Sequence, residues 1–154
     1  MKKLFFSTVI NAPKEKVWDA LWDRDSYGKW TAEFSEGSYA ESEWHEGGYI
    51  RFLAPEGDGM YSIIERKDQP NFMSFKHIGV VKNGEDMPLD DESRKWSGAM
   101  ENYTLQELGE GTELVVELDT TDDHESHFKE SFPRALNKVK DLAETKVDSD
   151  SELV

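Results

Sequence analysis

The final third of the chain contains a stretch in which apolar side chains recur at steps of three and four residues. Over residues 122–146 these side chains are Phe128, Phe132, Leu136, Val139 and then Leu142 or Ala143. This spacing predicts a helix with one apolar face, which must be buried against another element. Pro133 lies inside the pattern, so we expect a kink or a break just before it.

The segments that precede this helix are typical of β-strands. They are rich in β-branched and aromatic residues, and turns containing glycine, asparagine or proline separate them. Strands are predicted over residues 3–10, 38–44, 49–54, 60–67, 72–81, 99–108 and 112–119. A curved antiparallel sheet wrapped around the C-terminal helix satisfies this order, because the helix needs an apolar surface on which to pack.

A short helix is predicted between the first two strands. Pro13 suits its first position, where a missing backbone N–H costs nothing. One apolar stripe follows, formed by Val17, Trp18, Leu21 and Trp22. We interpret these side chains as structural, and we expect Trp30, in a turn beyond the helix, to lie at the entrance of a cavity.

The acidic segment 82–96 is the one long interruption in the strand pattern. A loop of this length in a compact domain is either a lid or a mobile surface excursion. Residues 1–146 are predicted to form one domain, since no linker or repeat divides them. Residues 147–154 are acidic and lack periodicity, so we expect a disordered tail.

Charge and cysteine content exclude several classes of function. The chain has 18 basic and 33 acidic residues, which gives a net charge of −15. Phosphate binding requires a basic face, so we expect no nucleic-acid partner, and by the same argument no anionic membrane partner. The absence of cysteine excludes disulfides, zinc–thiolate sites and thiol nucleophiles.

The first residues, MKKLFFSTVINAP, imitate a signal peptide. However, Ser7 and Thr8 interrupt the apolar run, Asn11 ends it, and the chain passes directly into a helix start. No apolar run approaches the ~20 residues needed to span a bilayer. We therefore expect a cytoplasmic location.

Several segments, taken in order, resemble the START-like (SRPBCC) superfamily. They are INAPKEKVWDALWD, EWHEGGYIRF, GMYSIIERKDQPNFMSFKHIG, ENYTLQELGEGTELVVELD and SFPRALNKVKDLAE. They are most similar to the branch named after the activator of the ninety-kilodalton heat-shock protein's ATPase, over residues 3 to about 146. The resemblance implies an α+β helix-grip (START/Bet v 1-like) fold, in which a curved seven-stranded antiparallel sheet wraps around a long C-terminal helix.

The same resemblance implies a cavity between sheet and helix. Known relatives hold lipids, hormones, polyketides or aromatic compounds in this cavity, and some catalyse cyclisation or dehydration there. The family has no universal catalytic motif that could be transferred to this sequence, and fold analogy alone does not choose among these roles.

Strand alternation predicts which side chains point toward the helix. Arg51, Ser74, Lys76, Glu113 and Glu117 are expected to face solvent. The inward set is then Ile50, Phe52, Met73, Phe75, His77, Glu101, Tyr103, Leu105, Leu114, Val116 and Leu118, with Phe128, Phe132 and Leu136 facing them from the long helix.

Two of these inward positions are unusual for a core. A buried histidine or carboxylate is costly unless it is hydrogen-bonded or paired. His77 and Glu101 flank the 82–96 loop, so they could pair at the cavity mouth with Tyr103 as a nearby donor. The alternative is a β-bulge that returns Glu101 to solvent and leaves His77 as a satisfied rim residue.

The other polar motifs are weaker. In DDHESH (122–127) the two histidines are too close for H-E-x-x-H, although Asp123 and His127 could share a helix face and hold a metal weakly. An acidic helix start explains this segment better. No phosphate loop or nucleophile elbow is present, so neither a cofactor nor a metal is predicted.

The leading hypothesis is therefore a domain that binds a small hydrophobic or aromatic molecule in an internal cavity. Its predicted lining is Trp30, Phe52, Phe75, His77, Trp96, Glu101, Tyr103, Phe128 and Phe132. One alternative is a cyclase or dehydratase that acts through His77 and Glu101. Another is a co-chaperone-like interaction domain, which needs a protein partner and an exposed docking patch but no cavity.

Overall fold

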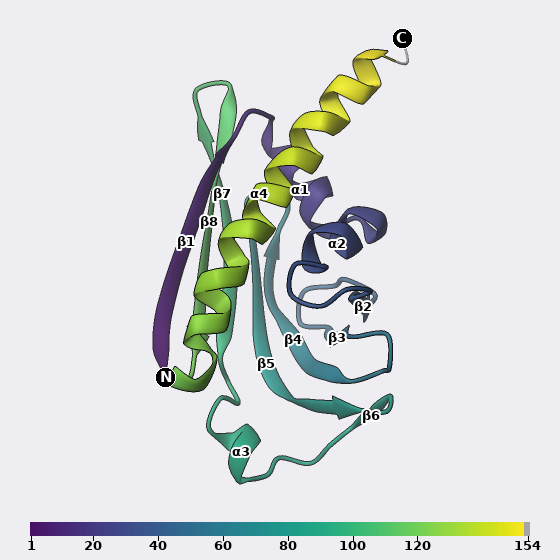
Figure 1. The fold of residues 1–154 in the computed structure, drawn as a ribbon, viewed down its shortest axis with the longest axis vertical. Helices are drawn as coiled ribbons and strands as arrows, with labels where there is room; N and C mark the ends of the chain where they lie inside the picture. The colour runs from purple at the N-terminus through teal and green to yellow at the C-terminus, as the bar shows by residue number, and fades with distance from the viewer. Residues whose placement is uncertain (153–154) are drawn as a thin grey trace.

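One antiparallel sheet forms the frame of the molecule (Figure 1). The computed structural model describes residues 1–152, with side chains for residues 1–145. In order of pairing, the strands are β1 (Lys2–Ile10), β8 (Gly111–Thr120), β7 (Met100–Leu108), β5 (Phe72–Lys82), β4 (Gly59–Asp68), β3 (Tyr49–Leu53) and β2 (Tyr39–Ser42). A short further strand, β6 (Glu85–Asp86), pairs with the end of β5.

The helices of the described chain are α1 (Lys14–Trp22), α2 (Arg24–Thr31), α3 (Asp91–Arg94) and α4 (Asp122–Glu152). The long α4 crosses the concave face of the sheet, and α1 and α2 pack against its flank (Figure 1). The sheet thus curves around α4, which confirms the predicted α+β helix-grip fold. The predicted seven strands are all present, and β6 adds to them.

The alternation of side chains along the strands predicted most of the buried core correctly. The inward side chains of the long strands are buried, among them Met73, Phe75, Tyr103, Leu105, Leu114, Val116 and Leu118. Ser74 differs from the prediction, because it is buried rather than exposed to solvent. Its hydroxyl donates to the Asn102 side chain across the β5–β7 pair, which satisfies the buried group.

Two predicted irregular segments contain regular structure. Residues 24–31 form α2, which places Trp30 inside a helix instead of a turn. The segment 82–96 contains β6 and α3, and Asp90 starts α3 with a capping box: it accepts the Ser93 N–H at 2.8 Å, and the Ser93 hydroxyl accepts the Asp90 N–H at 2.8 Å. Neither β6 nor α3 is long enough to show a hydrophobic period in the sequence.

The long helix passes Pro133 without interruption, so the predicted break is wrong. Proline removes one helical hydrogen bond. Phe132 and Leu136, on either side of it, are both buried in the core. Burial of these side chains outweighs the loss of one hydrogen bond, because each contributes roughly 1.5–3 kcal/mol.

Hydrogen bonds connect the segment before α1 to both α4 and β8. Pro13 is the N-cap residue, one position before the predicted one. The Asn11 N–H donates to Glu144 of α4 at 2.8 Å, and the Thr112 hydroxyl donates to the Ala12 carbonyl at 2.8 Å. These bonds hold the start of α1 against the sheet, so that its stripe of Val17, Trp18 and Leu21 lies in the core.

In the part of the chain that the structure describes, no helix is long and apolar enough to cross a membrane. The disordered tail predicted over residues 147–154 falls where side chains lie outside the described residues, as residues 153–154 do entirely. It stays a prediction, as does the cytoplasmic location.

Candidate functional site

Four polar side chains form a continuous hydrogen-bonded chain on the inner face of the sheet. The Ser62 Oγ lies 2.7 Å from the Nδ1 atom of His77, and the His77 Nε2 lies 2.9 Å from the Glu101 Oε1. The Tyr103 hydroxyl donates to the other carboxylate oxygen, Oε2. The predicted grouping of His77, Glu101 and Tyr103 is therefore confirmed, and Ser62 joins it.

The hydrogen-bond inventory determines the direction of each bond around a neutral imidazole. An ionised carboxylate only accepts, so Nε2 carries the proton that points at Glu101. Nδ1 is then the acceptor, and the Ser62 hydroxyl donates to it. Glu101 thus receives one donor on each oxygen, from His77 and from Tyr103.

Strand register brings these residues together. Ser62 of β4 is paired with His77 of β5, and Glu101 of β7 is paired with Phe75. The backbone of His77 is also fixed, since its N–H donates to the Ala99 carbonyl at 2.9 Å. The register is irregular between β4 and β5 but unbroken between β5 and β7. The alternative in which a bulge turns Glu101 out to solvent is therefore wrong.

Burial and hydrogen bonding act in opposite directions on Glu101. Burial raises the pKa of its carboxyl group, because it penalises the charged form. The hydrogen bond from His77, the electrostatic attraction between His77 and Glu101, and the hydrogen bond from Tyr103 together outweigh burial, so that the pKa of Glu101 lies below its usual value of 4.5. Burial, and then the charge of Glu101, raise the pKa of Tyr103 well above its usual value. At neutral pH the site holds a carboxylate and a phenol that donates to it.

Ser62, His77 and Glu101 are connected in the same order as the residues of a catalytic triad. The two ring nitrogens have exchanged roles, because Nδ1 faces the serine and Nε2 faces the carboxylate. Ser62, however, is fully buried and His77 is nearly so. A substrate carbonyl cannot reach this serine, so the chain does not supply a nucleophile. The Glu101 side chain keeps 24% of its surface exposed. It is therefore the group of this network that a ligand can contact.

Aromatic side chains surround the polar network on the sheet side. Phe52 packs on Phe75, with ring centroids 5.0 Å apart, and on His77 at 5.8 Å. Trp30 and Phe75 each lie 6.3 Å from the Tyr103 ring. The structure thus brings together six of the nine predicted lining residues: Trp30, Phe52, Phe75, His77, Glu101 and Tyr103. Trp30 is buried, and its indole N–H donates to the Leu21 carbonyl at 2.9 Å.

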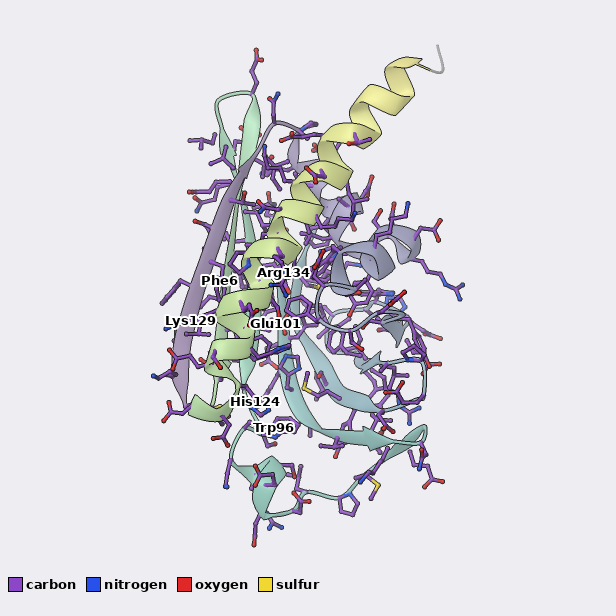
Figure 2. The ribbon with its side chains drawn as sticks, in the orientation of Figure 1. Phe6, Trp96, Glu101, His124, Lys129 and Arg134 are labelled. Carbon is purple, nitrogen blue, oxygen red and sulfur yellow. The ribbon has the colours of Figure 1, made fainter. Side chains whose placement is uncertain are left out.

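Two of the other three predicted residues, Phe128 and Phe132, reach this group through Phe34, which packs on Trp30 with ring centroids 6.4 Å apart. Phe128 and Phe132 of α4 pack on Phe34, with centroids 6.5 and 4.9 Å away. Trp96 follows α3, and in the view of Figure 2 its label lies below those of Glu101 and His124. The sequence pattern predicted no role for Phe34, because this residue lies outside every segment in which apolar side chains recur periodically.

Trp22 is partly buried and packs against the core of the molecule. Its ring contacts five others, Trp18, Trp30, Trp44, Phe75 and Tyr103, with centroid distances of 4.9–6.3 Å. This packing confirms the structural interpretation of the α1 tryptophans. It also reduces the space for the internal cavity that the sequence predicted.

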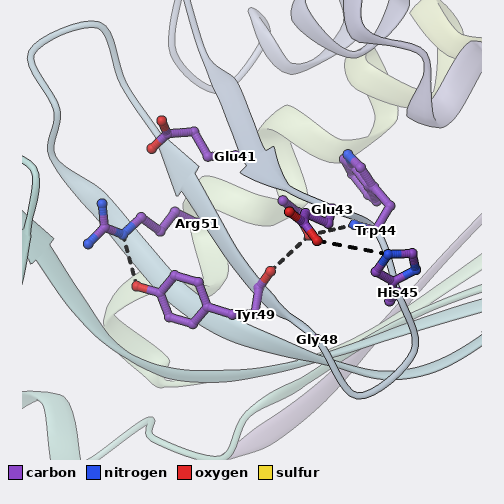
Figure 3. Close-up of a pocket in the computed structure, with 8 residues that line it drawn as sticks. Glu41, Glu43, Trp44, His45, Gly48, Tyr49 and Arg51 are labelled. Carbon is purple, nitrogen blue, oxygen red and sulfur yellow. Dashed lines mark hydrogen bonds and ion pairs between the residues drawn. The ribbon is translucent and has the colours of Figure 1, made fainter.

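Two hollows of the described chain lie elsewhere. One, of about 530 Å³, is on the outer face beside β2 and β3 (Figure 3). The other, of about 200 Å³, lies between α1 and the β4–β5 hairpin. Neither is lined by any of the nine residues predicted to line the cavity. Beside the network, the side chains of Glu101 and Phe52 are partly exposed.

The DDHESH segment begins α4 and has a structural role. The His124 ring Nδ1 lies 3.0 Å from the Thr121 hydroxyl, and Glu125 forms an ion pair with Lys2 of β1 at 2.8 Å. Among the described residues, no group of three or more histidine or acidic side chains is placed to hold a metal ion.

The model of one family, described as Activator of Hsp90 ATPase homolog 1-like protein, matches residues 11–144. The chain belongs to this family. No curated protein matches the sequence. The matched range extends from the entry to α1 well into α4, so it includes the residues of the Glu101 network but not β1.

Solved structures of the same fold agree. The Aha1 dimer from Colwellia psychrerythraea has a TM-score of 0.70 and 20% identity, over 92% of this chain and 95% of that one. An AHSA1-like protein from Aeromonas hydrophila has a TM-score of 0.67 and 18% identity, over 94% of each chain. DynU16, a protein in the dynemicin biosynthetic locus, has a TM-score of 0.67 and 14% identity, over 95% of this chain and 48% of that one. At these identities the likeness shows the shared fold.

Proposed function

We propose that the protein binds a small aromatic or hydrophobic molecule on the open inner face of the sheet, and that a donor group of this molecule hydrogen-bonds to Glu101. The single observation that carries this proposal is the reachable carboxylate of Glu101, held in place by His77 and Tyr103 and surrounded by aromatic rings. A few polar groups in a mainly apolar setting are typical of ligand sites.

The free hydrogen-bonding capacity of Glu101 defines the chemistry of the ligand. A carboxylate has about four acceptor positions, and the described contacts use two of them. A hydroxyl or an amine can donate to the others, whereas an acceptor group is repelled. The neighbouring rings of Phe52 and Phe75 favour a flat apolar body beside that donor.

The comparisons support a small molecule as the bound species. One protein of the same fold is described by its place in the dynemicin biosynthetic locus, which is a setting of small-molecule synthesis.

A matched pair of probes tests the donor requirement. We expect 1-naphthol to bind about tenfold more tightly than naphthalene in a fluorescence titration, because a hydrogen bond to a charged acceptor contributes about 1.5–3 kcal/mol. In Glu101→Gln this preference should fall to within about twofold. Glu107→Gln, at the exposed end of β7, is the control and should keep it. Equal binding of the two probes to the wild type would contradict the proposal.

The same geometry gives a second candidate function, a cyclase or dehydratase. Glu101 can accept a proton from a bound molecule, and the His77 ring, 2.9 Å away, holds the carboxylate in place. Chemical conversion of a molecule that co-purifies with the protein, seen by native mass spectrometry and lost in Glu101→Gln, would favour this function over binding alone.

A further inference from the structure

The outer face of the sheet at its β2 end carries exposed apolar side chains, next to the hollow drawn in Figure 3. We call it the outer patch and define it by Tyr39, Glu41, Glu43, Tyr49, Ile63 and Met87. The four apolar members are all exposed, and Tyr49, at 46%, is the most exposed of them. The adjoining hollow of about 530 Å³ is lined by Glu41 and Glu43 on β2 and the following loop, and by Tyr49 and Arg51 on β3.

The aromatic part of the outer patch is rigid. The Tyr49 ring stacks on the Tyr61 ring, with centroids 6.3 Å apart and planes 27° from parallel. Gly79 on β5 makes room for Tyr61, since a Cβ atom there would lie 2.5 Å from the Tyr61 hydroxyl oxygen. The Tyr61 hydroxyl donates to the Met87 carbonyl at 3.0 Å, which holds the segment after β6 against the patch. A flat surface of this kind requires little ordering when a partner binds.

The charges of the outer patch are predominantly negative. The guanidinium of Arg51 is matched by Asp86, at 3.0 Å, and its Nε donates to the Tyr49 hydroxyl at 2.8 Å. Glu41 forms no ion pair with any residue that the structure describes, although Arg51 is its cross-strand neighbour. Glu43 is 91% exposed, and one of its carboxylate oxygens lies 3.9 Å from the His45 ring. Two carboxylates are thus available beside an apolar platform.

We propose that the outer patch binds a basic, extended peptide segment of a partner protein. Lysine or arginine side chains of the segment would pair with Glu41 and Glu43, and its apolar side chains would cover Tyr49 and Ile63. A basic segment is the proposed partner because its positive charge complements the negative charge of Glu41 and Glu43. A second copy of this chain carries the same net charge of −15, so repulsion opposes self-association at an acidic surface.

The position of β2 supports an extended partner. β2 is the last strand in the pairing order, so the patch lies at a sheet edge. Exposed edges are where extended peptides bind. The proposal goes beyond ligand binding at Glu101 and uses none of its contacts, so either can fail without the other.

A labelled peptide of alternating arginine and valine tests the proposal by fluorescence anisotropy on the full chain. We expect saturable binding that weakens about fivefold in the double variant Glu41→Gln/Glu43→Gln, because each surface ion pair contributes about 0.2–1 kcal/mol. Tyr49→Ser should also weaken binding, because it removes the platform. A peptide of alternating glutamate and valine should not bind.

A matched control separates specific docking from general attraction to an acidic protein. Glu107→Gln/Glu110→Gln removes the same charge from the β7–β8 turn and should leave the affinity unchanged. Equal weakening in both double variants would overturn the proposal, and so would the absence of binding to the wild type. Backbone amide shifts on peptide addition should fall within residues 39–51 and 61–63, and shifts confined to α4 would also overturn it.

Discussion

At the scale of single residues, Glu101 shows how a core position tolerates a charge. The strand alternation that places Tyr103 in the core places Glu101 on the same face. The charge is tolerated there because both carboxylate oxygens have donors, one from an imidazole and one from a phenol. The alternation predicted this neighbourhood, but not Ser62, because the pairing of Ser62 with His77 depends on an irregular register.

The lowered pKa of Glu101 predicts a specific loss of stability in acid. A carboxyl whose pKa is lower in the folded state stabilises that state above its unfolded pKa, near 4.5, and the contribution is lost as pH falls through the folded value. Glu101→Gln should reduce the free energy of unfolding by about 1–3 kcal/mol at pH 7. The variant and the wild type should converge toward pH 3. Urea denaturation at pH 7 and pH 3 measures both.

Glu107→Gln, at an exposed position, is the matched control and should follow the wild type at both pH values. A difference between Glu101→Gln and the wild type that is the same at pH 3 and pH 7 would show that the carboxylate charge does not contribute.

At the scale of elements, the attachment of α4 depends on the inner half of its surface. Phe132 is buried, stacks on Phe6 of β1 at 5.0 Å and contacts Phe34 at 4.9 Å. Phe128, one turn earlier, is partly exposed and lies 6.5 Å from Phe34. The sequence pattern gave both phenylalanines the same role, because a period of 3.6 identifies a face but not how deeply each position is covered.

Truncation of these two side chains should therefore have unequal effects. Phe132→Ala should reduce the free energy of unfolding by about 3–5 kcal/mol, as for a fully buried phenylalanine. Phe128→Ala should cost about 1–2 kcal/mol, because less apolar surface is lost from the core. Urea titration monitored by circular dichroism measures both. Equal costs would mean that α4 is seated differently on the sheet.

At the scale of the whole molecule, negative charge is distributed over a fold that neutralises only part of it. Local ion pairs exist, such as Lys3 with Glu117 and Asp119 across β1 and β8. Because the chain has 33 acidic residues and 18 basic ones, such ion pairs neutralise only part of the negative charge. Self-repulsion of this kind destabilises a compact state and is screened by salt.

We therefore expect salt to stabilise the protein. Raising NaCl from 0.05 to 0.5 M should increase the midpoint of thermal unfolding by about 2–4 °C, which corresponds to about 1 kcal/mol for a chain of this size. Scanning calorimetry measures the shift. Glu107→Lys/Glu110→Lys should reduce it, because it lowers the net charge without touching the core. A midpoint that falls with added salt would show that local ion pairs dominate over self-repulsion.

The sequence by itself determined the fold class, the strands, the long helix and the inward group of His77, Glu101 and Tyr103. These features can be read from the sequence because periodicity and alternation depend only on residues that are near one another in the chain. Only the tertiary structure decided that Trp22 packs on five other aromatic rings, that Ser62 completes the hydrogen-bonded network and that a hollow of about 530 Å³ lies on the outer face. Those outcomes depend on register and on the packing of side chains far apart in the chain. Neither short helices such as α2 nor the available volume leaves a periodic signal.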